Sequence, residues 1–489
     1  MMSMHKSLIC LMLSLLSSQV SADNKTLDLS VYDNPKGFST RSIAKPIIQA
    51  IQSNDSVLVC HFDPNTFPTV VGLVDVIERS LCNDPQSKQA WALIKKQVAE
   101  VGVAKSSYLP MINASYNFGD GKTNYQVKDY QNLSYDTGIK SRNLSLEASW
   151  ILFDFGMRQS KIDQEKFLLS AAYANQNFIL QSILFNATQK YYEVVRLQSV
   201  LTAELEAENI AQQNANAAQE RHEVGVGILA DLLQAQTNQA KAISERIKAE
   251  GELQGAKGEL ASLMGAPVNT SYQIEKSENY ESFDRFSSSI DELLALAKKY
   301  HPELIAAQAQ IDASQAALKS VKREGFPVVS LTSSMTDSQQ QGTPPAETKN
   351  SNFYWGIKLS IPLFDGFSRQ NRIKSAEANL ESKYAELEQT QQQIAVNVWK
   401  SYYGLDAATE NMKAIDILQK SATQSYQVAL GRYKAGVGSM LELLSAQNAL
   451  VDAKQRKTSA LSSWKIARIQ LLASLGQLGL KEWSSENSK

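Results

Sequence analysis

The residue types that usually carry enzymatic chemistry are few and scattered in this chain of 489 residues. Its four histidines and three cysteines form no group with metal-ligand spacing. Gly121-Lys122-Thr123 resembles the end of a phosphate-binding loop, but the glycine required five positions before Gly121 is replaced by Tyr116. The segment also lies in a stretch that we predict to be a hairpin loop. We therefore expect no enzyme activity, no cofactor and no bound nucleotide or metal.

Composition argues against one class of partner. The formal net charge is -1 at pH 7, and aromatic residues do not interleave with clusters of Lys and Arg, so we expect no nucleic-acid partner. Outside the extreme N-terminus there is no run of about 18 apolar residues, which predicts that no helix spans a membrane. Insertion through β-strands stays open, because barrel strands give no such signal.

The N-terminal residues are typical of a secretory signal peptide covering residues 1–22. Lys6 supplies the positive flank of a short apolar core, and Val20-Ser21-Ala22 gives the small-residue cleavage pattern. Export places Cys60 and Cys82 in an oxidising compartment, which favours a disulfide between them. The bridge closes a loop of about 23 residues and is worth about 3 kcal/mol by the loop-entropy model. Two unpaired thiols are the alternative.

Repeated residues show that the chain contains two copies of one unit, because long gap-free matches at one offset seldom arise by chance. The offset is 211 residues, and the matches are Phe153-Asp154 with Phe364-Asp365, Arg158 with Arg369, Tyr191-Tyr192 with Tyr402-Tyr403, Arg221 with Arg432, Gly225 with Gly436, Gly227 with Gly438, Gln236 with Gln447, and Gly265 with Gly476. Upstream, Pro85 and Pro110 match Pro302 and Pro327 at an offset of 217 residues. The second copy is therefore shorter in this interval, which predicts an exposed loop of variable length there.

Each copy contains two segments in which apolar and polar residues alternate, the pattern of a strand with one apolar face. They span about residues 111–119, 143–152, 328–335 and 353–363. Polar, turn-rich stretches separate the members of each pair, which predicts two hairpins with long loops. Hairpins of a soluble sandwich are one interpretation. Aromatic strand ends and lengths of about nine residues favour a membrane-spanning barrel, and four strands are too few to close one, so the barrel interpretation requires several chains.

Long helices should follow each hairpin. Residues 154–223 and 365–434 are predicted as helices of about 100 Å, with a coiled-coil pattern of apolar residues. Asp154 and Asp365 stand where a capping carboxylate is expected. After the Gly turns, return helices are predicted over about 229–264 and 440–475, ending at Gly265 and Gly476. Upstream of each hairpin, the helical stretches Leu73 to Ser107 and Ile290 to Lys322 are interrupted by Pro85 and Pro302.

The predicted organisation is mainly α with a transmembrane β-barrel, built from two structural repeats of a hairpin plus coiled-coil helices. Its segments are the signal peptide 1–22, an N-terminal arm 23–72, repeat 1 over 73–265, a linker 266–289, repeat 2 over 290–476, and a tail 477–489.

Taken in this order, the motifs resemble those of the TolC-like outer-membrane efflux proteins. The resemblance runs from Leu73 to Gly476 and rests on the two Pro-plus-25 units, the two Phe-Asp junctions and the two Arg-x-x-x-Gly-Val-Gly turns. The stretch Leu81-Cys82-Asn83-Asp84-Pro85 looks most like type I secretion members. The resemblance implies a homotrimer with a twelve-stranded barrel in outer-membrane lipid and a periplasmic helical tunnel. It also implies a periplasmic adaptor protein and an inner-membrane pump of the ABC or RND type as partners.

The resemblance assigns roles at the far ends of the helices. The adaptor-docking tip is formed by Val224, Gly225, Val226 and Gly227 in the first copy and by Ala435, Gly436, Val437 and Gly438 in the second. A gate of acidic residues is implied at Glu442, with Asp231 as its first-copy equivalent. Arg432, Tyr433 and Tyr402 are candidates for contacts that hold the gate closed.

Plainer roles remain open for these residues. The glycines can simply permit a positive φ in a helical turn. Glu442 can be a solvated carboxylate on a helix surface, and the tyrosines can be packing residues. A coiled-coil scaffold of the periplasm or cell surface, without a pore, is the alternative to an export duct. Within the duct interpretation, the sequence leaves the cargo open between proteins and small molecules.

Overall fold

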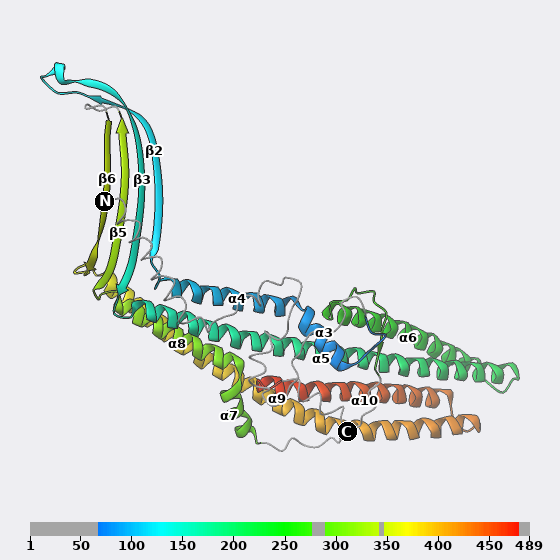
Figure 1. Ribbon diagram of the computed structural model, residues 1–489. Coiled ribbons are helices and arrows are strands. Elements are labelled where there is room, and N and C mark those ends of the chain that lie inside the picture. Colours follow the sequence, from blue (N-terminus) through cyan, green and yellow to red (C-terminus); the bar gives the residue numbers. More distant parts are fainter. Residues whose placement is uncertain (1–66, 276–288, 342–346, 479–489) are drawn as a thin grey trace.

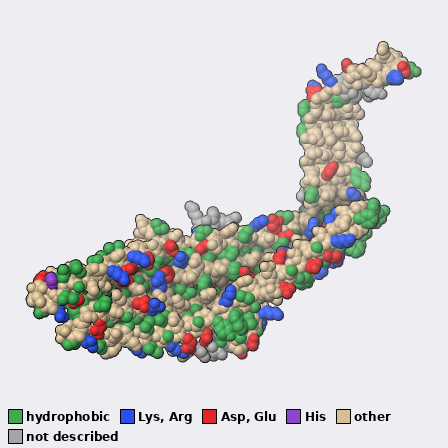
Figure 2. Space-filling view, turned by 180° about the vertical axis from the view of Figure 1, so that it is seen from behind, with side chains coloured by type: hydrophobic (Ala, Val, Ile, Leu, Met, Phe, Trp, Pro, Cys, Tyr) green, Lys and Arg blue, Asp and Glu red, His purple; other side chains and the backbone are tan. Residues whose placement is uncertain are grey.

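The computed structural model describes residues 67–275, 289–341 and 347–478. A sheet of four long strands stands at one end of the molecule, and a bundle of long helices runs away from it at an angle (Figure 1). On the face shown in Figure 2, charged side chains are spread along the helical part and are few on the sheet. No helix among the described residues is long and apolar enough to cross a membrane.

The sheet is antiparallel throughout and joins the two copies. Its order is β2 (Met111–Tyr125), β3 (Tyr135–Phe153), β5 (Val328–Gln341) and β6 (Glu347–Ser360). Each copy supplies one hairpin, and the central pairing of β3 with β5 connects them. Within this sheet β2 and β6 are the outer strands, each paired on one side.

The strands are longer than the alternation pattern predicted. The pairing of β2 with β3 continues past Gly119 to Tyr125 and Tyr135, and that of β5 with β6 continues past Met335 to Gln341 and Glu347. The turn-rich stretches that we expected to be loops are therefore largely strand. Most residues in these stretches are polar or Gly, so the alternation stops before the backbone pairing does. In contrast, β6 ends at Ser360, before Pro362, rather than at 363.

Two antiparallel helix pairs form the bundle. They are α5 (Met157–Glu223) with α6 (Leu229–Leu263), and α9 (Ser368–Lys434) with α10 (Met440–Ser474). The helices α5 and α9 have 67 residues each, which corresponds to about 100 Å. Both begin about three residues after the predicted positions, because a left-handed residue, Gly156 or Phe367, occupies the N-cap position.

The two aspartates nevertheless stabilise the helix starts, as expected. Asp154 accepts hydrogen bonds from the backbone N–H groups of Gly156 (3.2 Å) and Arg158 (2.8 Å). Asp365 accepts one from Arg369 N–H (2.9 Å). In the first copy the Arg158 side chain also forms a buried ion pair with Asp154 (3.0 Å). The carboxylates thus cap orphan N–H groups from outside the N-cap position itself.

Proline divides the upstream helices at the predicted places. The first copy has α3 (Leu73–Asn83) and α4 (Pro85–Ser106), and the second has α7 (Ile290–Tyr300) and α8 (Pro302–Arg323). Asp84 and His301 cap the second helix of each pair through their side chains. These breaks pack onto the ends of the return helices, where Gly265 and Gly476 adopt positive φ angles of 75° and 70°.

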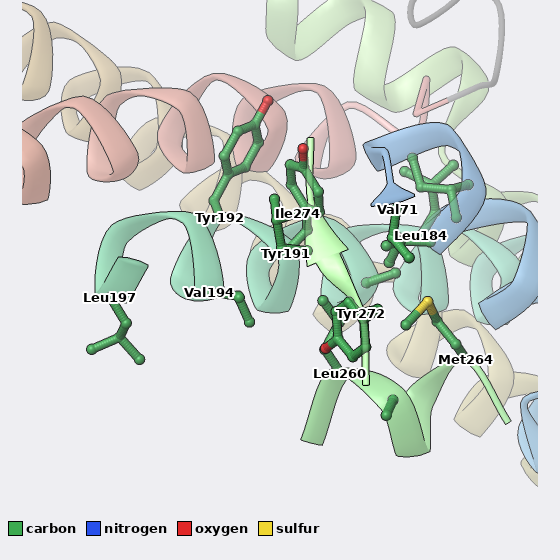
Figure 3. Close-up of a cluster of buried hydrophobic side chains, with 14 of the residues drawn as sticks. Val71, Leu184, Tyr191, Tyr192, Val194, Leu197, Leu260, Met264, Tyr272 and Ile274 are labelled. Carbon is green, nitrogen blue, oxygen red and sulfur yellow. The ribbon is translucent and has the colours of Figure 1, made fainter. Parts of the chain in front are cut away.

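The largest core cluster lies midway along the bundle and is shown in Figure 3. Side chains of α5 such as Leu184 and Tyr191 pack there against Leu260 and Met264 at the end of α6. A short parallel pair, β1 (Val70–Val71) and β4 (Gln273–Ile274), covers this cluster. The end of the predicted N-terminal arm is therefore part of the core.

Candidate gate and docking site at the helix tips

The two helix pairs lie against each other at the ends farthest from the sheet (Figure 1). One apolar cluster contains residues from all four helices. Its buried members are Ala215 and Ala218 of α5, Ala235 of α6, Ala429 and Tyr433 of α9, and Met440, Leu443, Leu444 and Ala446 of α10. Alanine dominates on the first copy, so the helix backbones can approach closely and Tyr433 fills the space between them.

The two Gly turns have the same backbone geometry. Gly225 and Gly436 have φ angles of 78° and 77°, which a side chain rarely adopts. In the first turn, Arg221 C=O accepts hydrogen bonds from Val226 N–H (3.0 Å) and Gly227 N–H (2.8 Å). In the second turn, Arg432 C=O accepts the equivalent pair. This is the Schellman ending of a helix, so the glycines have a structural role that exists independently of any docking role.

Glu442 forms an ion pair with Arg432 across the second turn. Arg432 Nε lies 3.1 Å from Glu442 Oε1, and the side chains are 52% and 43% exposed. The backbone N–H of Glu442 donates to the Ser439 hydroxyl (3.1 Å), which places the carboxylate in the first turn of α10. The structure thus brings two predicted gate residues together, with a pair that is open to water.

The side chain of Arg221, in the first repeat, contacts the second repeat, whereas the side chain of Arg432 contacts its own helix pair. Its Nη1 donates to the backbone carbonyl of Tyr433 (3.1 Å), and its guanidinium carbon lies 4.9 Å from the centre of the Tyr433 ring. Burial raises the pKa of the Tyr433 hydroxyl, while Arg221 lowers it and Asp231 raises it further. Asp231 therefore also lies close enough to act on Tyr433. Together these residues tie one helix pair to the other.

The sequence analysis missed one contact of this site, and of the two roles it left open for Tyr402 the structure favours packing. Arg221 was recognised as a repeated residue but not as a contact of the gate. The sequence carried a signal for this contact. Arg221 matches Arg432 in the second repeat, but the residue after it is His222 where the second repeat has Tyr433, so the two arginines have different neighbours. Tyr402 does not belong to the site: it lies about 45 Å before Arg432 along α9 and packs in a different core cluster.

The tips also expose apolar side chains to solvent. Val224 and Val226 of the first turn are 73% and 68% exposed, and Val437 of the second is 70% exposed. Neighbouring residues that were not predicted belong to the same surface, namely Ile228, Leu229, Leu233 and Leu441. Exposed apolar residues gathered at the end of a molecule are typical of a contact with another protein.

Behind the tips, the seam between α5 and α10 is mainly polar. Asn214 Nδ2 donates to Gln447 Oε1 (2.8 Å) in a buried contact, and Lys454 forms an ion pair with Glu206 (2.6 Å). Glu204 contacts Gln455. Burial raises the pKa of the Glu204 carboxyl, with Glu245 acting in the same direction. Within the described residues, no group of three or more His, Cys, Asp or Glu side chains is placed to hold a metal ion.

The predicted disulfide lies partly outside the part of the chain that the structure describes. Cys82 is buried near the end of α3, and Cys60 falls outside the described residues. The Cys60–Cys82 pairing therefore stays a prediction, as does the signal peptide.

Known proteins resemble this chain over most of its length. A family model described as outer membrane efflux protein matches residues 76–266 and 293–477. Protein CyaE of Bordetella pertussis is 28% identical over 410 residues, which cover 84% of this chain and 85% of that protein. Outer membrane protein TolC of Escherichia coli K12 is 20% identical over 433 residues, covering 85% and 84%. The Campylobacter jejuni CmeC outer membrane channel has a similar fold, with a TM-score of 0.71 at 17% identity, covering 89% of this chain and 95% of that one.

Proposed function

Because the chain belongs to the outer membrane efflux protein family, we propose that it forms the exit duct of a tripartite export system. The protein lies in the outer membrane, and its family is one of transport channels. The observation that carries the proposal is a sheet with open outer strands joined directly to helix pairs of about 100 Å. This combination suits a pore through one membrane that continues as a tunnel toward another. A periplasmic scaffold without a pore would not require a sheet with two unpaired outer strands.

In the proposed assembly three identical chains close one barrel. Strands β2 and β6 are the free edges of the four-stranded sheet, and an unpaired edge exposes N–H and C=O groups that lipid cannot satisfy. Pairing of β6 in one chain with β2 in the next chain removes every edge and gives twelve strands. The helix pairs of the three chains then surround a common axis in the periplasm.

The tips are proposed to carry docking and gating. The exposed valines beside Gly225 and Gly436 are the adaptor-docking surface, and the adaptor connects the duct to an inner-membrane pump of the ABC or RND type. Glu442, Asp231 and Arg432 line the closed entrance, and Tyr433 is buried beside them. Three copies of Glu442 around a narrow opening attract cations, as acidic rings do in cation pores. The duct itself is passive, and the partners supply the energy.

Fractionation and conductance test this function. The full chain, expressed with its signal peptide, should sediment with outer membranes, and the purified oligomer should open cation-selective channels in planar bilayers. A protein that stays in the soluble periplasmic fraction and conducts no ions would refute the duct and favour the coiled-coil scaffold. Deletion of the gene, with assays of both drug sensitivity and secreted proteins, then identifies the class of cargo.

A further inference from the structure

The carboxylate of Glu204 is buried on the face of α5 that packs against other helices behind the tips. Its side chain is 6% exposed. The residues seven before it and three and seven after it, Leu197, Ala207 and Ala211, lie on the same face of α5 and are all buried. Glu204 therefore occupies a core position in an otherwise apolar stripe of the helix.

Two neighbouring glutamates of α5 have a cation partner, whereas Glu204 has none. Glu206 pairs with Lys454 of α10 (2.6 Å), and Glu208 pairs with Arg246 of α6 (2.9 Å). Among the described residues, no ion pair includes Glu204. A carboxylate that is buried without a cation is costly to keep charged, and binding a proton removes that cost.

The groups that face Glu204 come from both helices packed against it. From α10, Gln455 Nε2 donates a hydrogen bond to the carboxylate, and the adjacent Lys454 is engaged in its own ion pair. From α6, Glu245 adds a second negative charge, and Lys241 acts against it. Burial is the largest of these effects, and together they raise the pKa of the Glu204 carboxyl. The packed arrangement thus favours the protonated side chain.

The second repeat shows that this position does not require a carboxylate. Glu204 corresponds to Ile415 of α9, which packs against an apolar core cluster. An apolar side chain thus fills the equivalent place without any electrostatic cost. The buried acid belongs to the first repeat alone, where the same position lies between α6 and α10, that is, between the first helix pair and the second. A residue that breaks the apolar pattern at a cost to stability indicates a functional role.

We propose that Glu204 is a proton-binding site that controls how firmly the two helix pairs are held together. When it is protonated, the neutral side chain stays in the seam beside Gln455. When it is charged, it favours the separated arrangement, in which water reaches the carboxylate. This role rests on the proposed duct, whose entrance opens when the helix pairs separate. Acidification should therefore close the duct, and a neutral pH should favour opening.

The sign and the pH range follow from the two states of the side chain. In the open state, water returns the pKa of Glu204 toward its ordinary value of 4.5, while in the closed state the pKa is higher. As pH falls toward 4.5, the closed state binds the proton first and becomes more populated. Each titrating Glu204 changes the ratio of closed to open states by at most about tenfold for each pH unit.

Planar-bilayer recordings of the purified oligomer test this switch. In the wild type, the open fraction should fall at least about threefold between about pH 7.5 and about pH 5. Glu204→Gln keeps the size of the side chain and an acceptor for Gln455 but cannot titrate, so its open fraction should be low at both pH values. Glu204→Ile, which introduces the side chain of the second repeat, should behave in the same way. Glu206→Gln is the matched control and should keep the fall, because Glu206 is exposed on the same helix.

Thermal unfolding gives a second readout that needs no channel. Because the pKa of Glu204 is raised in the folded protein, its charged form destabilises the fold at high pH, and this penalty is lost as pH falls. The thermal midpoint of Glu204→Gln should therefore exceed that of the wild type at about pH 7.5, and the two should converge as pH approaches about 4.5. Glu206→Gln should show no such convergence.

The outcomes separate the switch from the duct on which it rests. An open fraction that falls with pH as steeply in Glu204→Gln as in the wild type would overturn the switch and leave the duct in place. A difference between the two midpoints that is the same at every pH would also overturn it, because Glu204 would then bind no proton in this range. A wild-type protein that opens no channel at any pH would overturn the duct, and with it the role of Glu204 in opening, even where the midpoints converge.

Discussion

Arg221 and Arg432 occupy equivalent positions at the two tips, yet their contacts predict unequal contributions to keeping the tips closed. Arg432 pairs with Glu442 within its own helix pair, and both side chains are about half exposed. Arg221 reaches across to the other helix pair and contacts buried Tyr433. Only the second contact is lost when the two helix pairs separate. We therefore expect Arg221→Ala to favour the open state more than Arg432→Ala.

The size of the difference follows from these contacts. An exposed ion pair such as Arg432 with Glu442 contributes about 0.2–1 kcal/mol, which changes an equilibrium by at most about fivefold. For Arg221, a hydrogen bond from a charged donor contributes about 1.5–3 kcal/mol, and the contact with the Tyr433 ring adds about 0.5–1 kcal/mol. A loss of about 2 kcal/mol shifts the ratio of closed to open states about thirtyfold.

Planar-bilayer recordings measure this ratio as the open fraction of single channels. Arg221→Ala should raise the open fraction by one order of magnitude or more, and Arg432→Ala by no more than about fivefold. Arg221→Lys is the matched control, because it keeps the charge and one donor but loses the planar stacking, and it should fall between the two. An open fraction that rises more in Arg432→Ala than in Arg221→Ala would refute this account of the closed tip.

Three further predictions concern single positions. Burial lowers the pKa of His301 to about 4 from 6.5, so the unfolded state binds the proton first as pH falls, and up to about 3 kcal/mol of stability is lost between pH 6.5 and pH 4. His301→Asn keeps a capping side chain and should remove this loss, so its thermal midpoint should fall less than that of the wild type over the same pH range. The opposing effect of nearby Glu303 is common to both proteins. Gly436→Ala should cost about 1–2 kcal/mol because of its positive φ, measured by thermal unfolding, and an unchanged midpoint would contradict the strain. Glu442→Gln should lower the preference for cations in reversal-potential measurements, and unchanged selectivity would exclude Glu442 from the entrance.

The repeat made most of the fold predictable from sequence. Helix ends at Gly265 and Gly476 and helix starts after Pro85 and Pro302 depend on local backbone chemistry, so they could be placed closely. The strand ends could not, because pairing continues through mostly polar residues in which apolar and polar positions no longer alternate. At the tips, the residue types were predicted but their partners were not. Whether Arg221 contacts its own turn or the other copy depends on how the helix pairs pack, and the buried Tyr433 decides this.

The contacts between the two helix pairs indicate how strongly salt should affect opening. Behind the tips they include the hydrogen bond of Asn214 with Gln447 and the ion pair of Lys454 with Glu206, polar contacts that water replaces at little net cost once the helices part. At the tips, separation of the helix pairs also exposes the apolar cluster that contains Met440 and Leu443, at about 25 cal/mol for each Å² of apolar surface. Higher salt weakens the ion pair and not the apolar contacts, so the open fraction should rise only slightly with salt. A steep rise would contradict the conclusion that the apolar cluster holds the tips together.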